Sequence, residues 1–98
     1  MTNPKYRLRL FVSGSSSHSL RAVGNLKRIC RDELGDQFDL EIIDVLEQPE
    51  QAEAAKVLAT PTLIRELPPP IRRIIGDLSQ SDEVLLGLDV TPTDSGGE

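Results

Sequence analysis

The residues that could do chemistry in this chain are few, and several of them fall in one polar loop, "GSSSH" (14–18). A Gly/Ser-rich loop can cradle a phosphate, and a serine near a histidine can act as a nucleophile. This loop lacks the lysine and the spacing of a Walker motif, and no Asp/His pair is recognisably placed to activate a serine. The loop is better explained as the segment before a helix, with Ser17 or Ser19 as the capping residue.

His18 and Cys30 are the only histidine and the only cysteine among 98 residues. A single cysteine excludes an internal disulfide and a cysteine-rich metal site, and His18 has no evident second ligand. Cys30 falls on an apolar stripe, which indicates a core position, and His18 is expected at the surface. We therefore expect no catalytic residue, no metal and no cofactor, and we do not expect an enzyme.

Charge is segregated along the sequence, although the net charge is only −5. Residues 1–31 carry seven bases and no acid, residues 32–55 carry nine acids and no base, and Lys56 then stands alone. Such a bipolar surface suits a charged protein partner, because complementary fields steer encounter. The alternative is two faces that balance each other inside the monomer. The acidic run 32–53 has no divalent-metal loop pattern.

Two classes of partner are not expected. The sequence pI of 4.8 and the lack of aromatic residues among the bases argue against nucleic acid. No segment approaches the ~20 apolar residues of a membrane span, and the N-terminus has no signal-peptide core. The protein is expected to be soluble and cytoplasmic.

The elements that would position these residues read as β-α-β-α in the first half. Tyr6–Val12 alternates apolar and basic residues, as a half-buried strand does. A helical stripe runs from Leu20 to a stop at Gly35. Residues 38–46 read as a strand buried on both faces, and Pro49 opens a short helix.

The second half fits two patterns about equally well. In the first, Thr62–Leu67 is a strand, Ile71–Ile75 is its antiparallel partner, and Ser79 or Ser81 caps a final helix. In the second, Val84–Val90 is a strand that follows a helix with an apolar stripe of Ile71, Ile74, Ile75 and Leu78. Pro68, Pro69 and Pro70 make a rigid corner that is compatible with both, because no proline donates a backbone hydrogen bond.

The first pattern gives βαβαββα, the order of a thioredoxin-like α/β fold. That fold places its redox dithiol at the start of the first helix, which here is residues 15–18, and those residues include no cysteine. Thiol–disulfide exchange at that position is therefore excluded. The Thr60–Pro61 bond lies where such folds place a cis-proline, and we expect it to be cis.

Five segments resemble the KaiB family of small bacterial clock proteins, and together they run from about Tyr6 to Val90. They are "LFVSG", "EIIDVLEQPEQAE", "LATPTL", "LPPPIRRIIGDLS" and "VLLGLDV". The resemblance implies a metamorphic protein, which is either a thioredoxin-like monomer or a βαββααβ tetramer. These two states match the two patterns left open above. We expect a single domain over residues 1–90 and a disordered tail over 91–98.

The resemblance also implies a function. Members of the family bind the N-terminal ATPase ring of KaiC and modulate its phosphorylation cycle, and they capture KaiA or engage histidine kinases of the SasA and CikA type. By position, the residues expected to face KaiC are Lys56, Arg21, Phe38, Asp39, Arg72 and Arg73. The positions expected to influence the choice of fold are Gly87, Asp89, Pro61, Pro68, Pro69 and Pro70.

Two departures from the family pattern bear on these expectations. The loop after the first strand lacks a proline that relatives often have, and the chain ends at Glu98, before the longer acidic tail of many relatives. The short tail favours a monomer or a weak oligomer over a stable tetramer. The alternative functions are an adaptor or stress-response protein for another histidine kinase and, disfavoured by the missing dithiol, a thioredoxin-like redox protein.

Overall fold

The computed structural model describes residues 5–14, 16–35 and 37–88. Along the chain they form β1 (Tyr6–Val12), α1 (Ser17–Ile29), the π-helical turn η1 (Cys30–Leu34), β2 (Phe38–Asp44), α2 (Pro49–Ala54), β3 (Thr62–Leu67), β4 (Arg72–Ile75) and α3 (Ser81–Leu88). The thioredoxin-like order βαβαββα is thus confirmed. Asp89 and the predicted tail, 91–98, lie outside the described residues.

The four strands form one sheet in the order β2-β1-β3-β4. β1 and β2 are parallel, and the other two pairs are antiparallel. The hairpin of β3 and β4 pairs Thr62 with Ile75 and Arg65 with Arg72. In this structure residues 72–75 are therefore a strand, as the first of the two patterns predicts, and not part of a helix.

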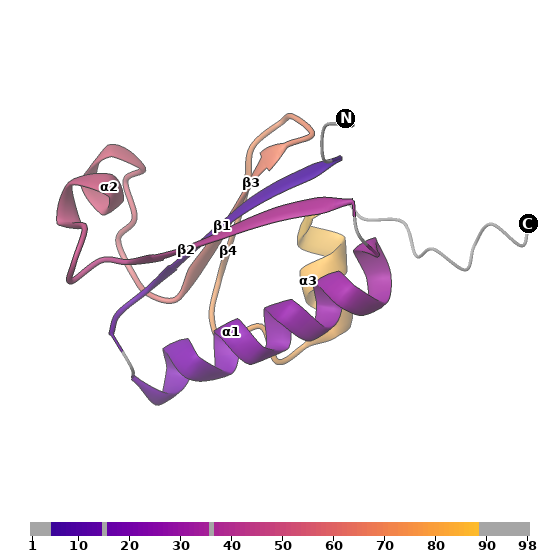
Figure 1. Cartoon of the computed structure of the whole chain (residues 1–98), viewed down its shortest axis with the longest axis horizontal. Helices are drawn as coiled ribbons and strands as arrows, with labels where there is room; N and C mark the ends of the chain where they lie inside the picture. Colours follow the sequence, from indigo (N-terminus) through magenta and orange to yellow (C-terminus); the bar gives the residue numbers. More distant parts are fainter. Residues whose placement is uncertain (1–4, 15, 36, 89–98) are drawn as a thin grey trace, which may run out of the picture.

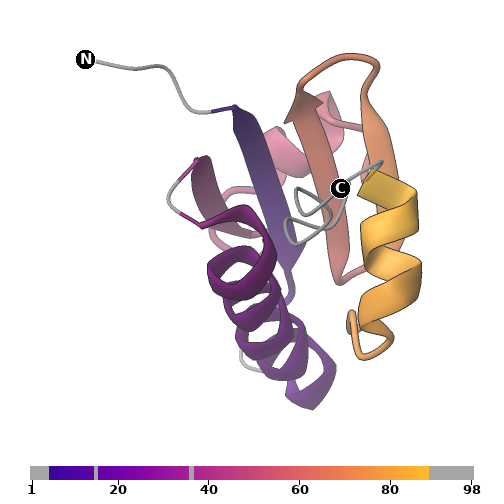
Figure 2. The same cartoon turned by 90° about the vertical axis from the view of Figure 1, so that its right-hand side faces the viewer.

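The helices divide between the two faces of the sheet. Figures 1 and 2 show α1 and α3 on one face and α2 on the other. The larger core lies under α1 and α3 and includes Leu8 and Leu10 of β1. The smaller core packs Phe11, Ile43 and Ile64 against α2 and the residues that follow it. The predicted alternation of β1 is confirmed, because Arg7 and Arg9 lie on the α2 face.

Three details of the first half differ from prediction. Leu20 is exposed, because the buried face of α1 begins one residue earlier, at Ser19. The N-cap is Ser16, whose hydroxyl oxygen accepts from the Ser19 backbone N–H at 3.2 Å. β2 is not buried on both faces: it is an edge strand, and Ile42 is 39% exposed. A run of apolar residues does not by itself distinguish an edge strand from a central one.

The proline corner is held by a buried arginine. The peptide bonds before Pro61, Pro68 and Pro70 are cis, and the first of these confirms a prediction. Arg65 of β3 is 2% exposed, and its Nη2 donates to the Pro70 carbonyl oxygen at 2.7 Å. Arginine is rarely this buried unless it is paired. The corner between β3 and β4 is thus fastened by a guanidinium that the sequence pattern did not single out.

Gly87 lets α3 lie close against the sheet. A β-carbon at this position would come within 2.8 Å of Cδ1 and 3.0 Å of Cγ1 of Ile74 on β4. The glycine weakens the helix by about 1 kcal/mol relative to alanine. Its packing against Ile74 gives a physical reason for a glycine in the interior of α3.

We expect Gly87→Ala to stabilise the chain more in an Ile74→Val background than in the wild-type background. Alanine adds about 1 kcal/mol of helix propensity, but its β-carbon must displace the isoleucine. Valine lacks the Cδ1 methyl, which is the nearest contact. Urea unfolding of the wild type, the two single variants and the double variant should give a coupling free energy of about 0.5–1 kcal/mol between the two substitutions. An equal effect of Gly87→Ala in both backgrounds would contradict this account.

Candidate functional site

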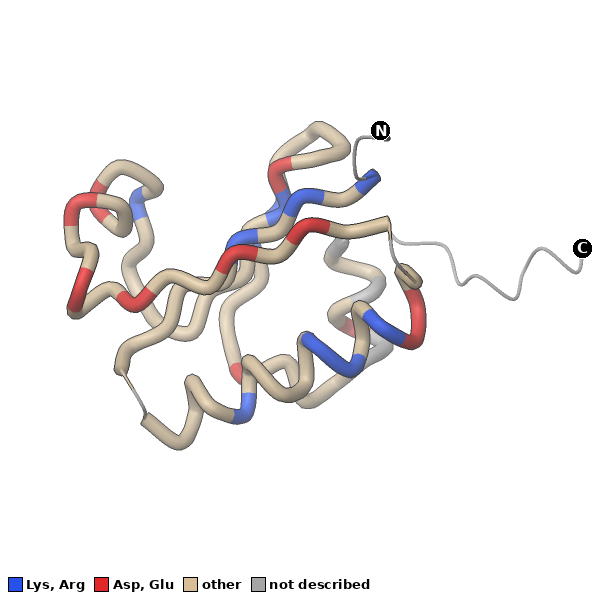
Figure 3. The backbone as a smooth tube through the Cα atoms, viewed as in Figure 1, with Lys and Arg blue, Asp and Glu red and all other residues tan. Residues whose placement is uncertain are grey.

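The charge segregation seen in the sequence is largely balanced between neighbouring strands. Arg7 Nε lies 3.8 Å from an Asp39 carboxylate oxygen, and Arg9 Nε lies 3.6 Å from one of Glu41. On the other side, Arg9 Nη1 contacts Glu66 of β3 at 3.1 Å. Figure 3 shows the basic and acidic positions side by side along β1 and β2. For the strands, ion pairing within the monomer explains why bases and acids are segregated along the sequence.

Arg9 also fastens α2 to the sheet. Its Nη2 donates to the Gln51 side-chain oxygen at 2.5 Å, and its guanidinium lies 5.0 Å from the centre of the Phe11 ring. Only 19% of this side chain is exposed. Arg9 thus contacts β2, β3 and α2 at once.

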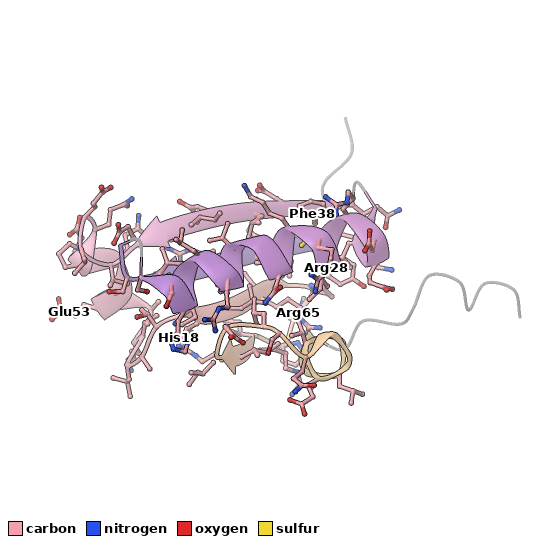
Figure 4. The ribbon with its side chains drawn as sticks, turned by 90° about the horizontal axis from the view of Figure 1, so that it is seen from below. His18, Arg28, Phe38, Glu53 and Arg65 are labelled. Carbon is pink, nitrogen blue, oxygen red and sulfur yellow. The ribbon has the colours of Figure 1, made fainter. Side chains whose placement is uncertain are left out.

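The outer face of α1 keeps a basic surface. Lys27 and Arg28 are exposed, and no ion pair joins either of them to a residue that the structure describes. Both lie on the solvent side of α1, which continues into η1, so solvation of this face explains them. His18 is exposed at the start of the same helix, as predicted (Figure 4).

Phe38 and Asp39 lie far from α2. Phe38 starts β2, pairs with Tyr6 and packs against the larger core. Figure 4 shows it at the opposite end of the molecule from Glu53 of α2. Because Lys56 follows α2 directly, these two predicted site residues are not brought together with Lys56.

Arg21 ties α1 to the connection between β4 and α3. Its Nη1 lies 3.6 Å from an Asp77 carboxylate oxygen, and Asn25 donates to the Asp77 backbone oxygen at 2.8 Å. The Ser79 backbone N–H donates to the same carboxylate at 3.1 Å. Hydrogen bonds from Ser79, and then the charge of Arg21, hold the pKa of Asp77 below its usual value of 3.8.

Asp77 should therefore contribute to stability at neutral pH. A carboxyl whose folded pKa is lowered stabilises the fold above its unfolded pKa, and that contribution is lost as the pH falls through the folded pKa. Asp77→Asn should flatten the fall in the free energy of unfolding below about pH 4. Asp32→Asn, on the exposed side of η1, controls for the loss of one charge. Identical pH profiles for wild type and Asp77→Asn would count against this role.

Arg73 joins β4 to the end of α2. Its two Nη groups donate to the backbone oxygens of Ala55 and Lys56, the second at 3.4 Å. The last carbonyls of a helix have no partner within the helix and favour a cation. Lys56 has a φ of 58° and an exposed side chain. The structure thus brings together Lys56 and Arg73, two of the six predicted contact residues.

Aliphatic side chains surround these two cations. Ile71 is 62%, Ile75 68% and Leu58 97% exposed. Leu58 and Ile75 line a hollow of about 320 Å³ together with Lys56 and Arg73. We call Lys56, Leu58, Ile71, Arg73 and Ile75 the Lys56–Arg73 face.

The aliphatic members of this face were not among the predicted site residues, although one of the two patterns for the second half placed Ile71 and Ile75 on an apolar stripe. Alternation along β4 could have indicated that Ile71 and Ile75 flank Arg73. By the same alternation, Arg72 points to the opposite face of the sheet. Arg72 therefore borders the Lys56–Arg73 face without belonging to it.

Cys30 belongs to the larger core and not to the Lys56–Arg73 face. Cys30 is fully buried, and burial raises its thiol pKa to about 12, which suppresses the reactive thiolate. No cluster of three His, Cys, Asp or Glu side chains suited to a metal occurs in the described ranges. Within those ranges, no helix is long and apolar enough to cross a membrane.

Solved structures define the class of protein. The N-terminal domain of SasA from Synechococcus elongatus matches with a TM-score of 0.72 at 25% identity, covering 91% of this chain and 87% of that domain. Mitochondrial thioredoxin 3 from Saccharomyces cerevisiae matches with a TM-score of 0.71 at 17% identity, covering 88% and 78%. The chain is a thioredoxin-like protein that lacks the dithiol.

Sequence relatives identify the family. The family model described as the KaiB domain matches residues 9–90. The circadian clock protein KaiB3 of Synechocystis sp. is 58% identical over 85 residues, which cover 87% of this chain and 83% of the relative. The circadian clock oscillator protein KaiB of Prochlorococcus marinus subsp. pastoris is 53% identical over 85 residues, covering 87% and 79%. The chain belongs to the KaiB family, as its motifs predicted.

Proposed function

We propose that this chain is a non-enzymatic regulatory protein of a Kai-type clock, acting in the cytoplasm. In this proposal it docks on the N-terminal ATPase ring of KaiC and modulates the KaiC phosphorylation cycle. The relatives named as circadian clock proteins support the class of function. The observation that carries the docking surface is the contact of Arg73 with the end of α2, which sets two cations among exposed aliphatic side chains.

The composition of the Lys56–Arg73 face is that of an interface. Contiguous exposed aliphatic side chains mark binding surfaces, and arginine is enriched among the residues that dominate binding energy. No ion pair involves Lys56 in the described part of the chain. A partner that offers an acidic side chain beside an apolar one would fit both the charge and the 320 Å³ hollow.

Docking in this proposal depends on the fold of the second half. Arg73 reaches from β4 to the carbonyls of Ala55 and Lys56 at the end of α2, so the proposed face requires residues 72–75 to be a strand. In the βαββααβ tetramer, where the sequence pattern makes these residues helical, the face would be lost. We propose that Gly87, Asp89 and the prolines at 61, 68, 69 and 70 set the balance between the two states.

The remaining expectations from the family stay predictions. Arg21, Phe38 and Asp39 lie away from the Lys56–Arg73 face and would contact KaiC only through a broad interface, whereas Arg72 borders the face. KaiA and histidine kinases of the SasA and CikA type are proposed as further partners. The fold match to the SasA N-terminal domain supports the idea that this chain and SasA dock at the same site on KaiC. A single domain over 1–90 with a tail over 91–98 is likewise a proposal.

Lys56→Glu tests the docking face. The substitution puts an anion where the proposal requires a cation, so the affinity for KaiC should fall by about tenfold or more. Lys27→Glu is the matched control, because it makes the same charge change on an exposed lysine of α1. Binding is measured by biolayer interferometry with KaiC from the same genome, after equal thermal stability of the variants has been verified.

Two results would contradict the proposal. Equal affinities for wild type and Lys56→Glu would remove Lys56 from the interface. No binding of KaiC by the wild type would reject the clock function itself and favour an adaptor for another histidine kinase.

A further inference from the structure

A second cavity, of about 270 Å³, opens beside the Lys56–Arg73 face. Its charged lining comes from four segments: Arg9 of β1, Lys56 after α2, Glu66 of β3 and Arg73 of β4. Its other walls are aliphatic and come from α2, Ala55, β3 and Ile71. Three cations from three different elements therefore meet at one hollow.

The lining carries an excess of positive charge. Three cations and one carboxylate leave a formal charge of +2 on the side chains of the cavity. The Glu66 carboxylate accepts from Arg9 Nη1 at 3.1 Å, so these two charges offset each other and the excess comes from Lys56 and Arg73. Glu41, the other acid near Arg9, does not line the cavity, and 59% of its side chain is exposed.

We propose that this cavity binds a phosphate group. A phosphate monoester carries about −1.5 to −2 charges at pH 7, which matches the charge of the lining. Its tetrahedral oxygens can accept from donors that arrive from several directions, whereas a carboxylate is planar and carries a single charge. The aliphatic walls from Ala55, Ile64 and Ile71 are placed to contact the carbon group of a phosphate ester.

Occupancy of this cavity would affect the neighbouring surface. Lys56 and Arg73 line both the cavity and the 320 Å³ hollow of the docking face. A bound phosphate would neutralise the charge that the face offers to an acidic partner. The phosphate site does not depend on KaiC docking, and its test uses the isolated chain, so that failure of one proposal leaves the other standing.

The test is an NMR titration of the full-length chain with methyl phosphate, inorganic phosphate and acetate, at constant pH and ionic strength. Saturable shifts are expected at the amides of Ala54, Ala55, Ile64 and Ile71. Comparison of methyl phosphate with inorganic phosphate distinguishes an ester from the free ion. Tighter binding of methyl phosphate would indicate that the aliphatic walls contact its carbon group. Acetate should bind at least about tenfold more weakly than either, because it carries half the charge.

Three variants should affect the affinity for methyl phosphate differently: one should weaken it, one should tighten it and one should leave it unchanged. Arg73→Gln should weaken methyl phosphate binding by about tenfold, through the loss of a charged donor. Glu66→Gln removes the only acid of the lining but keeps an acceptor for Arg9, and it should tighten binding by about three- to tenfold. Arg28→Gln, on α1, is the control and should leave the affinity unchanged.

Shifts that grow linearly without saturation would overturn the proposal, because they indicate non-specific ionic effects. Equal affinity for acetate and phosphate, an equal loss in Arg28→Gln, or no tightening in Glu66→Gln would each overturn it as well.

Discussion

The contact between the Arg73 guanidinium and the backbone carbonyls of Ala55 and Lys56, just after α2, connects the two halves of the molecule. α2 has six residues, too few to be stable as an isolated helix. β4 has four residues and pairs only with β3. Each therefore depends on contacts with other elements, and Arg73 supplies one contact to both. The surface around Lys56 thus depends on the fold of a segment 17 residues further along the chain.

The ion pairs of the sheet determine which charges are available to partners. The arginines of β1 lie between acids of β2 and β3, so most of the charge of the strands is neutralised locally. Lys56 is in a different position, because it follows α2 and has no ion-pair partner among the described residues. Charge that is balanced inside the sheet contributes to the fold, and charge beside the exposed aliphatic residues is free to contribute to binding.

The sequence predicted those features that local patterns determine. The alternation of Tyr6–Val12 and the stop at Gly35 were both predicted, since each follows from spacing or from backbone freedom, whereas the hairpin over residues 62–75 was one of two patterns left open. The burial of Ser19 in place of Leu20 at the start of α1 was missed, because Ser19 accepts a hydrogen bond from the Ser13 backbone N–H that periodicity does not show.

The site could be predicted only in part, because its geometry is non-local. Lys56 and Arg73 were both named, but from family resemblance, and nothing in their spacing indicates that they meet. Buried Arg65 donates to a carbonyl oxygen of the proline corner. That corner takes its shape only when β3 and β4 pair, so the sequence pattern does not reveal the burial. The choice between the two patterns of the second half was also beyond the sequence, since both satisfy its periodicity.

We propose that residues 72–75 are a strand when the Lys56–Arg73 face binds KaiC. Backbone NMR chemical shifts over residues 60–90, recorded for the free chain and for the chain bound to the N-terminal ring of KaiC, test it directly. We expect strand shifts at 72–75 and helical shifts at 81–88 in the bound chain. Helical shifts over 71–78 in the bound chain would contradict it.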